Sequence, residues 1–289
     1  MLGRLLTRAV DAQARWSKPL GDVNHRWLSA LFRPVRPLKD LLNGTWLGHP
    51  VHAVVSDVPI GALTVSIIAD LLGQAIVADV SMLVGVLAMV AAAVTGAADY
   101  SDIDGTARNR ATVHSVIMTS SLVVYAISLL MRNGQPADRL VPILLAGLAY
   151  VLLAVGAAIG GDLVYLIGTN VDRHAWRGAG TKWIALDLGG LADIPQGGPT
   201  RLKAGINELA VIRDGDRILA VHGQCAHAGG PLGEGAVVDD AIECPWHGSR
   251  FRLTDGHVVR GPAVYDQPAY EVRPSEQGGW EARRRSATV

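Results

Sequence analysis

Four long apolar runs occupy the first half of the chain and constrain its fold more than any other feature. Three of them have 19, 21 and 22 residues without a charged side chain, at positions 80–98, 111–131 and 140–161. The fourth, 51–72, is as long but contains His52, Asp57 and Asp70. A helix of about 20 apolar residues crosses a bilayer and satisfies its own backbone groups there. We therefore expect four transmembrane helices, with buried helices of a soluble bundle as the alternative.

Small residues recur at helical spacing within two of these runs. Ala92 and Gly96 share a face of the second run, and Gly156 and Gly160 share a face of the fourth. Small residues four positions apart let helix backbones approach closely. The pattern is typical of helix packing, although alanine-rich runs also produce such pairs by chance.

Basic residues in the flanking segments predict the orientation. Residues 1–46 carry eight Lys or Arg against three Asp, and the turn after the first run has no basic residue. Arg132 and Arg139 in the turn after the third run weaken this asymmetry. The positive-inside rule places the N-terminus in the cytoplasm. Four crossings of the lipid bilayer then return the C-terminal part to the cytoplasm, so we expect an integral protein of a bacterial plasma membrane.

The basic segment 1–46 interleaves arginine with leucine at helical spacing. It lacks the continuous apolar core of a signal peptide. Trp16 and Trp27 are candidate anchors at the membrane interface. We expect helices that lie on the membrane surface; the alternative is solvated helices packed on the cytoplasmic domain.

The last third of the chain changes to short alternating segments. Stretches such as ELAVIRDG and RILAVHG are separated by Gly, Asp and Pro, and Asp-Gly pairs stand at 214–215 and 255–256. These features predict a small antiparallel sandwich or barrel.

Both cysteines of the chain lie in this part, and each has a histidine close behind it. Cys225 precedes His227 by two residues, and Cys244 precedes His247 by three. Three chemistries use such residues. A disulfide is disfavoured in the cytoplasm and leaves the histidines unexplained. Zinc accepts two Cys and two His, and so does a [2Fe–2S] cluster with two thiolates on one iron and two imidazoles on the other.

The motifs CAHAGGPL, CPWHGSRF, DGHVVRGPA and YEVR resemble those of Rieske ferredoxins over roughly 100 residues. The resemblance implies a [2Fe–2S] cluster with Cys225 and Cys244 on the inner iron and His227 and His247 on the exposed iron. It also implies residues that shape the cluster loops and the loop covering them: Gly229, Gly230, Pro231, Pro245, Gly248 and Pro262.

The chain departs from the related Rieske proteins of respiratory complexes. Those carry an extra disulfide, whereas this chain has Gly230 and Trp246 at or near the corresponding positions. Ser249 matches a serine that donates a hydrogen bond to the cluster, but Phe251 replaces a tyrosine that does the same. Such donors raise cluster potentials, so we expect a potential below the respiratory class. Because no mononuclear-iron domain follows the loops, we expect an electron carrier or oxidoreductase subunit rather than a complete enzyme.

The apolar half contains ionisable residues that gather near the predicted cytoplasmic ends of its helices: His52, Asp57, Asp99, His114 and Asp162. Ionisable groups within membrane spans mark functional sites by default. The motifs HPVH, PIGA and GGDLVYLIG in and around these spans resemble a family of bacterial four-helix membrane domains. His52 and His114 could hold a haem b, line a quinone or proton-relay site, or bond to Asp or backbone groups at the membrane edge. For a haem, Asp57, Asp99 or Asp162 are the candidate partners that orient the imidazoles.

The sequence thus predicts a membrane all-α four-helix bundle followed by an all-β Rieske domain. The expected domains are a basic segment at 1–46, the transmembrane domain at 47–170, the Rieske domain at 180–278 and a tail at 279–289. We expect electron transfer between a cytoplasmic protein partner, a reductase or oxygenase component, and haem b or quinone in the membrane. The alternative is a redox- or iron-responsive sensor. Zero net charge argues against a nucleic-acid partner.

Overall fold

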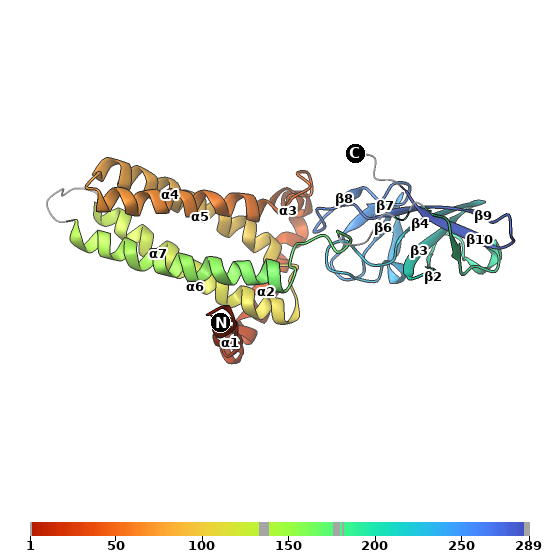
Figure 1. Ribbon diagram of the computed structural model, residues 1–289, viewed down its shortest axis with the longest axis horizontal. Coiled ribbons are helices and arrows are strands. Elements are labelled where there is room, and N and C mark those ends of the chain that lie inside the picture. The colour runs from red at the N-terminus through yellow and green to blue at the C-terminus, as the bar shows by residue number, and fades with distance from the viewer. Residues whose placement is uncertain (1, 133–138, 176–179, 181, 286–289) are drawn as a thin grey trace. The chain divides into compact units, whose positions relative to one another are not determined.

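The protein is described by a computed structural model that covers residues 2–132, 139–175, 180 and 182–285. The chain divides into two compact units, each built from two stretches of sequence. The first unit joins Met1–Leu38 to Pro50–Thr169, and the second joins Lys39–His49 to Asn170–Val289. Figure 1 shows the long helices of the first unit and the strands of the second.

Four long helices form the core of the first unit, and each is long and apolar enough to cross a membrane: α4 (Val51–Leu71), α5 (Ala75–Tyr100), α6 (Gly105–Arg132) and α7 (Leu140–Gly161). A short π-helical turn, η2 (Asp162–Leu166), extends α7. Large apolar side chains cover the outside of these helices; Leu87, Leu130 and Leu144 are each more than half exposed. An apolar exterior suits a lipid environment. The four expected helices are confirmed, and each could span a membrane.

Short helices precede the bundle: α1 (Leu2–Asp11), α2 (Ala14–Phe32), η1 (Arg33–Val35) and α3 (Arg36–Asn43). The Arg110 guanidinium on α6 donates to both carboxylate oxygens of Asp11, at 2.8 and 2.9 Å. Gly21 on α2 lies against Tyr100 and Thr112. The N-terminal helices therefore pack on α6, while Trp27 remains 75% exposed. Their location at the membrane surface stays a prediction.

The four long helices form two hairpins, α4–α5 and α6–α7, that repeat one pattern. Equivalent residues of α4 and α6 lie 62 positions apart: His52 and His114, Leu63 and Tyr125, Ser66 and Ser128, Asp70 and Arg132. Equivalent residues of α5 and α7 lie 64 positions apart: Ala78 and Pro142, Ala92 and Gly156, Gly96 and Gly160.

Buried contacts of the two hairpins match as well. The Ser66 hydroxyl donates to the Ala78 carbonyl at 2.8 Å, and the equivalent Ser128 hydroxyl donates to the Pro142 carbonyl at 2.7 Å. Leu63 and Tyr125 are both fully buried. The bundle is therefore an internal repeat of one helical hairpin, with both copies running in the same direction.

Four charged residues join the hairpins at the end where α4 and α6 terminate. The Arg132 guanidinium donates to both oxygens of Asp70, at 2.9 and 2.6 Å, and to Asp79 at 2.9 Å. Arg139 donates to Asp79 and is 3.5 Å from Asp70. The Arg132 and Asp70 side chains are 1% and 2% exposed. The first hairpin thus supplies both acids of this ion cluster, and the second supplies both bases.

The second unit contains a closed barrel in the order β1-β10-β9-β4-β3-β2. Its strands are antiparallel: β1 (Ile184–Leu186), β2 (Pro199–Ala204), β3 (Asn207–Asp214), β4 (Arg217–His222), β9 (Ala269–Pro274) and β10 (Trp280–Arg284). Short turns η3 (Leu191–Asp193) and η4 (Leu232–Glu234) lie between strands. Strand β10 falls within the expected tail, 279–289, because it pairs with β1 and β9, which are distant in sequence. Residues 286–289 of that tail lie outside the described residues.

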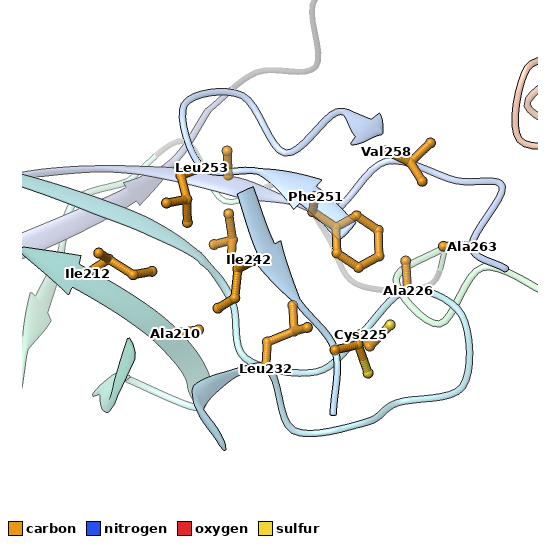
Figure 2. Packing of buried hydrophobic residues seen from close by; sticks show 13 residues of the cluster. Ala210, Ile212, Cys225, Ala226, Leu232, Ile242, Phe251, Leu253, Val258 and Ala263 are labelled. Carbon is orange, nitrogen blue, oxygen red and sulfur yellow. The ribbon is translucent and has the colours of Figure 1, made fainter. Parts of the chain in front are cut away.

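A second antiparallel sheet, inserted between β4 and β9, carries the Cys/His loops: β5 (Ala236–Val238), β6 (Ala241–Glu243), β7 (Arg250–Arg252) and β8 (Val258–Arg260). Its buried face shares a core with the barrel. Figure 2 shows Ile242, Phe251 and Leu232 in this cluster, with Cys225 at one end. The expected fold class, a helical bundle followed by a small β domain, is confirmed.

Candidate metal centre

The predicted ligands lie on two loops that approach each other at the edge of the second sheet. Cys225 and His227 follow strand β4, while Cys244 and His247 connect β6 to β7. The structure therefore brings both halves of the motif together, although 16 residues separate His227 from Cys244 in sequence.

The two loops share one backbone hydrogen-bond pattern. The Cys225 amide donates to the Gly230 carbonyl and the Gly229 amide donates to the Cys225 carbonyl, both at 2.8 Å. The second loop repeats this: Cys244 N–H to Ser249 at 2.8 Å, and Gly248 N–H to Cys244 at 3.0 Å. The fourth residue after each cysteine has positive φ, +81° at Gly229 and +76° at Gly248. Glycine adopts this conformation without strain, which explains both positions.

Burial separates the cysteines from the histidines. Cys225 and Cys244 are 1% and 3% exposed, whereas His227 and His247 are half-buried. The two imidazole ring centroids are 5.0 Å apart, with perpendicular planes. The four groups thus form an inner pair of thiols and an outer pair of imidazoles.

The paired thiols differ in their tendency to ionise. The hydrogen bond from Cys225, helped by backbone N–H groups of Trp246 and His247, lowers the pKa of Cys244 to about 6. The same hydrogen bond, together with burial, raises the pKa of Cys225 well above its usual value. The thiolate is the form of cysteine that binds metal, so the loop favours the ligating form at Cys244.

The donor set fits a mixed-ligand [2Fe–2S] cluster, in which two thiolates hold one iron and two imidazoles hold the other. Each iron then needs only two side chains from the protein. Among the residues that the structure describes, no three His, Cys, Asp or Glu side chains are arranged to hold a single ion.

Gly230 has a steric role at the centre. A Cβ there would lie 2.7 Å from the Cys244 sulfur and 3.1 Å from the Trp246 ring. Glycine therefore lets the first loop approach the second. Pro231 continues the loop through a β-bridge with Gln224, and the Trp246 ring beside it is 58% exposed.

Ser249, Phe251 and Pro262 lie around the inner side of the loops. The Ala263 amide donates to the Ser249 hydroxyl oxygen at 3.0 Å, and Phe251 is fully buried in the shared core. Two residues from the segment 39–49 also bond to the backbone on either side of Pro262. The Asp40 carboxylate accepts from the Gly261 amide at 3.1 Å, and the Thr45 hydroxyl donates to the Ala263 carbonyl at 3.2 Å.

Gln267 was missed in the sequence analysis; its side chain holds the backbone of the first cluster loop, which carries Cys225 and His227, by three hydrogen bonds. Its side-chain amide nitrogen donates to the carbonyls of His222 and Gln224, at 2.7 and 2.6 Å. Its carbonyl accepts from the Ala226 amide at 2.8 Å. His174, which has no recognisable motif in the sequence, bonds to the Gln224 carbonyl at 2.8 Å. Because these contacts are made to backbone atoms, the sequence contains no matching residue type that could have indicated them.

The membrane histidines occupy matching positions in the two hairpins. Nδ1 of His52 is 2.8 Å from the Ala92 carbonyl oxygen, and Nδ1 of His114 is 2.8 Å from the Gly156 carbonyl oxygen.

The aspartates named as candidate partners of these histidines have different surroundings. Asp57 is exposed on α4, and Asp162 accepts a hydrogen bond from Thr7 at 3.0 Å. Asp99 lies near the end of α5. Nδ1 of each ring bonds to a backbone carbonyl, because small residues on α5 and α7 leave that carbonyl within reach; a role for the aspartates stays a prediction.

Comparison with known proteins finds a matching family for each of the two parts of the chain. Residues 185–271 match the Rieske [2Fe-2S] domain, and residues 48–173 match DUF2231, a predicted membrane protein domain. Ferredoxin CarAc of Metapseudomonas resinovorans is 35% identical over 74 residues, 26% of this chain and 69% of that protein. The anthranilate 1,2-dioxygenase ferredoxin subunit of Burkholderia cepacia is 31% identical over 86 residues, 30% of this chain and 80% of that protein.

Among solved structures, the ferredoxin of carbazole 1,9a-dioxygenase from Nocardioides aromaticivorans IC177 is similar. It is 30% identical, with 36% of this chain and 94% of that chain covered, at a TM-score of 0.30.

Proposed function

Because this chain belongs to the Rieske [2Fe-2S] family, and a predicted membrane domain of the DUF2231 family precedes the Rieske domain, we propose that it is a membrane-anchored electron carrier. It transfers single electrons between a protein redox partner and an acceptor in the membrane, either haem b or quinone. The proposed limits are 1–46 for the basic segment, 47–170 for the membrane domain, and 180 to the end of β10 for the Rieske domain.

One observation carries the proposal: the two matching loops bring two buried thiols and two half-buried imidazoles together. We assign Cys225 and Cys244 to the inner iron, and His227 and His247 to the outer iron. A cluster of this kind, when bound, accepts and releases one electron at a time. The chain's own contribution is to exclude water from the sulfur side and to leave the imidazole side accessible for electron exchange.

The named relatives support the class of partner. CarAc is a ferredoxin, and the Burkholderia protein is the ferredoxin subunit of a dioxygenase. We therefore propose that a reductase or oxygenase component exchanges electrons with this Rieske domain. The excess of basic residues in 1–46 supports a cytoplasmic N-terminus, and the four spans α4–α7 support a cytoplasmic Rieske domain. The chain is accordingly assigned to a bacterial plasma membrane.

Metal analysis of the purified full-length protein tests the cluster. We expect two non-haem irons and two acid-labile sulfides per chain, with the electron paramagnetic resonance of a mixed-ligand cluster after reduction. Cys244→Ser removes both the non-haem iron and the signal, because the remaining thiol cannot hold the inner iron alone. His257→Ala, which changes an exposed histidine outside the two loops, serves as the matched control. Stoichiometric zinc in place of iron contradicts the proposal.

A further inference from the structure

The two membrane histidines have matching carbonyl and glycine neighbours in the two hairpins, although Thr95, 3.5 Å from Nδ1 of His52, is replaced by Ile159 at the equivalent position beside His114. His52 on α4 bonds to the carbonyl of Ala92 on α5, and His114 on α6 bonds to the carbonyl of Gly156 on α7. The next turn of α5 and of α7 presents a glycine to each ring. A Cβ at Gly96 would lie 2.9 Å from Cε1 of His52, and a Cβ at Gly160 would lie 3.2 Å from Cε1 of His114. The repeat therefore preserves a histidine, a carbonyl acceptor and an open position beside the ring.

The repeat also places the two imidazoles at one depth and on facing sides. Asp70 and Arg132 touch at 2.6 Å across the hairpins, and each lies 18 residues after its histidine. Eighteen residues make about five helical turns, or roughly 27 Å. Each histidine therefore shares the helix face of the ion-cluster residue below it, and that face points toward the other hairpin.

The carbonyl partners determine which ring nitrogen is available. A carbonyl oxygen only accepts hydrogen bonds, so Nδ1 of each neutral ring carries the proton and donates it. Nε2 of His52 and of His114 then presents a lone pair. An imidazole held in this way, with its other nitrogen bonded to a carbonyl, is the usual state of a histidine that ligates a metal.

This protonation state distinguishes between quinone, a bare metal ion and haem as ligands of the two histidines. Quinone carbonyls need hydrogen-bond donors, whereas both Nε2 atoms are acceptors. A bare ion such as Zn²⁺ is usually held by three or four protein ligands, and no third His, Cys, Asp or Glu joins this pair among the described residues. Haem iron brings four equatorial nitrogens and needs only axial ligands. Covalent haem attachment uses cysteines, and both cysteines of this chain lie in the Rieske domain.

We propose that Nε2 of His52 and Nε2 of His114 are the two axial ligands of one non-covalently bound haem b in the membrane domain. This haem would be the membrane acceptor of the proposed electron carrier, so the inference rests on that proposed function. Gly96 and Gly160 are positioning residues, because they let each ring reach the carbonyl that orients it.

The absorption spectrum of the full-length protein in detergent tests the site. The reduced protein should show the bands of a bis-histidine haem b, and protein purified without haem should acquire them when haemin is added. His52→Ala and His114→Ala should each abolish them. His114→Met retains an axial ligand and should therefore keep the haem with shifted bands, which a purely structural histidine would not explain.

Glycine variants provide matched controls within the same two hairpins. Gly96→Ala and Gly160→Ala displace the rings and should weaken haemin binding by about 10- to 100-fold. A Cβ at Gly61 or Gly147 meets no atom within 4 Å, so Gly61→Ala and Gly147→Ala should bind haemin as the unaltered protein does.

The cluster signal of the same sample separates the two proposals. Protein that retains the iron–sulfur resonance but shows no haem bands after haemin addition refutes the haem site and leaves the electron carrier standing. Haem bands that persist in either histidine-to-alanine variant refute it equally. A missing cluster refutes the proposed function, whatever the haem bands show.

Discussion

Ser249 combines burial with a hydrogen bond that leaves its own proton available. Its oxygen accepts from the Ala263 amide at 3.0 Å, so the hydroxyl hydrogen points away from that amide. The residue is fully buried next to the second cluster loop. A hydroxyl in this position suits donation to a cluster sulfur, which favours the more negative, reduced state.

Removal of this donor should lower the midpoint potential. One hydrogen bond that is stronger by ~1 kcal/mol in the reduced state corresponds to a shift of about 40 mV for a one-electron couple. Ser249→Ala should therefore shift the midpoint downward by that order. Phe251→Tyr should shift it upward if the added hydroxyl reaches a ligand sulfur. Voltammetry of the purified protein measures both, and unchanged midpoints in the two variants would show that these side chains point elsewhere.

Gly230 provides a steric prediction at the same centre. An added methyl group would lie 2.7 Å from the Cys244 sulfur, closer than atoms can approach without displacement. Gly230→Ala should therefore lower the iron content per chain, because the loops separate. Gly198→Ala is the control, since a Cβ there meets nothing within 4 Å. Iron and sulfide assays on both variants decide the matter, and full cluster occupancy in Gly230→Ala would contradict the steric argument.

The spacing of the Cys/His motif indicated the candidate ligands because side-chain identity carries that information. Backbone partners carry none. Backbone groups were among the partners considered for the membrane histidines, but the particular carbonyls, those of Ala92 and Gly156, could not be recognised from the sequence. Gln267 was missed for the same reason, since all three hydrogen bonds of its side chain are made to backbone atoms.

At the level of elements, the ion cluster couples the two hairpins, and its central pair, Arg132 and Asp70, is almost wholly removed from solvent. Removing one member of a buried ion pair leaves its partner without compensation, which typically costs about 3–5 kcal/mol. Arg132 is the more buried of the two bases, with its side chain 1% exposed, and it bonds to both Asp70 and Asp79.

Arg132→Met should therefore reduce the free energy of unfolding in detergent by several kcal/mol, about 3–5 on this basis. Asp70→Asn should act similarly. The double variant should lose less than the sum of the two, because neither charge is then left alone. Arg139→Gln is the comparison: its side chain is 19% exposed and should cost less. Additive losses in the double variant would show that Arg132 and Asp70 act independently.

Helices and strands could be predicted from the sequence where their formation depends on residues close together in the chain. The lengths of the apolar runs predicted α4 to α7, since a span depends on its own composition. Strand β10 was expected to be tail, because its pairing with β1 and β9 joins residues far apart in the chain. The repeat of the hairpins was also missed. His52 and His114 share the dipeptide Val-His, but most equivalent pairs, such as Leu63 and Tyr125, differ in residue type.

For the whole molecule, the testable feature is orientation across the membrane. Arg132 and Arg139 weakened the charge asymmetry in the sequence, and the structure pairs both with aspartates of the first hairpin. The segment 1–46 retains eight basic residues against three acidic ones. A cytoplasmic N-terminus therefore remains the prediction.

Cysteine labelling of intact cells measures this directly, because both natural cysteines are buried. A membrane-impermeant maleimide should label Gln74→Cys, in the turn between α4 and α5, without disruption of the cells. Ile206→Cys, in a fully exposed turn of the Rieske domain, should be labelled only after permeabilisation. The opposite pattern would place the Rieske domain outside the cytoplasm.

The division of charge between the hairpins has a consequence during biosynthesis. The ribosome delivers α4–α5, with both acids, before α6–α7, with both bases. Two nascent chains that meet at this stage would bring four carboxylates together and repel each other. Two first hairpins therefore do not pair with each other, and the acids are neutralised only when a second hairpin brings its arginines.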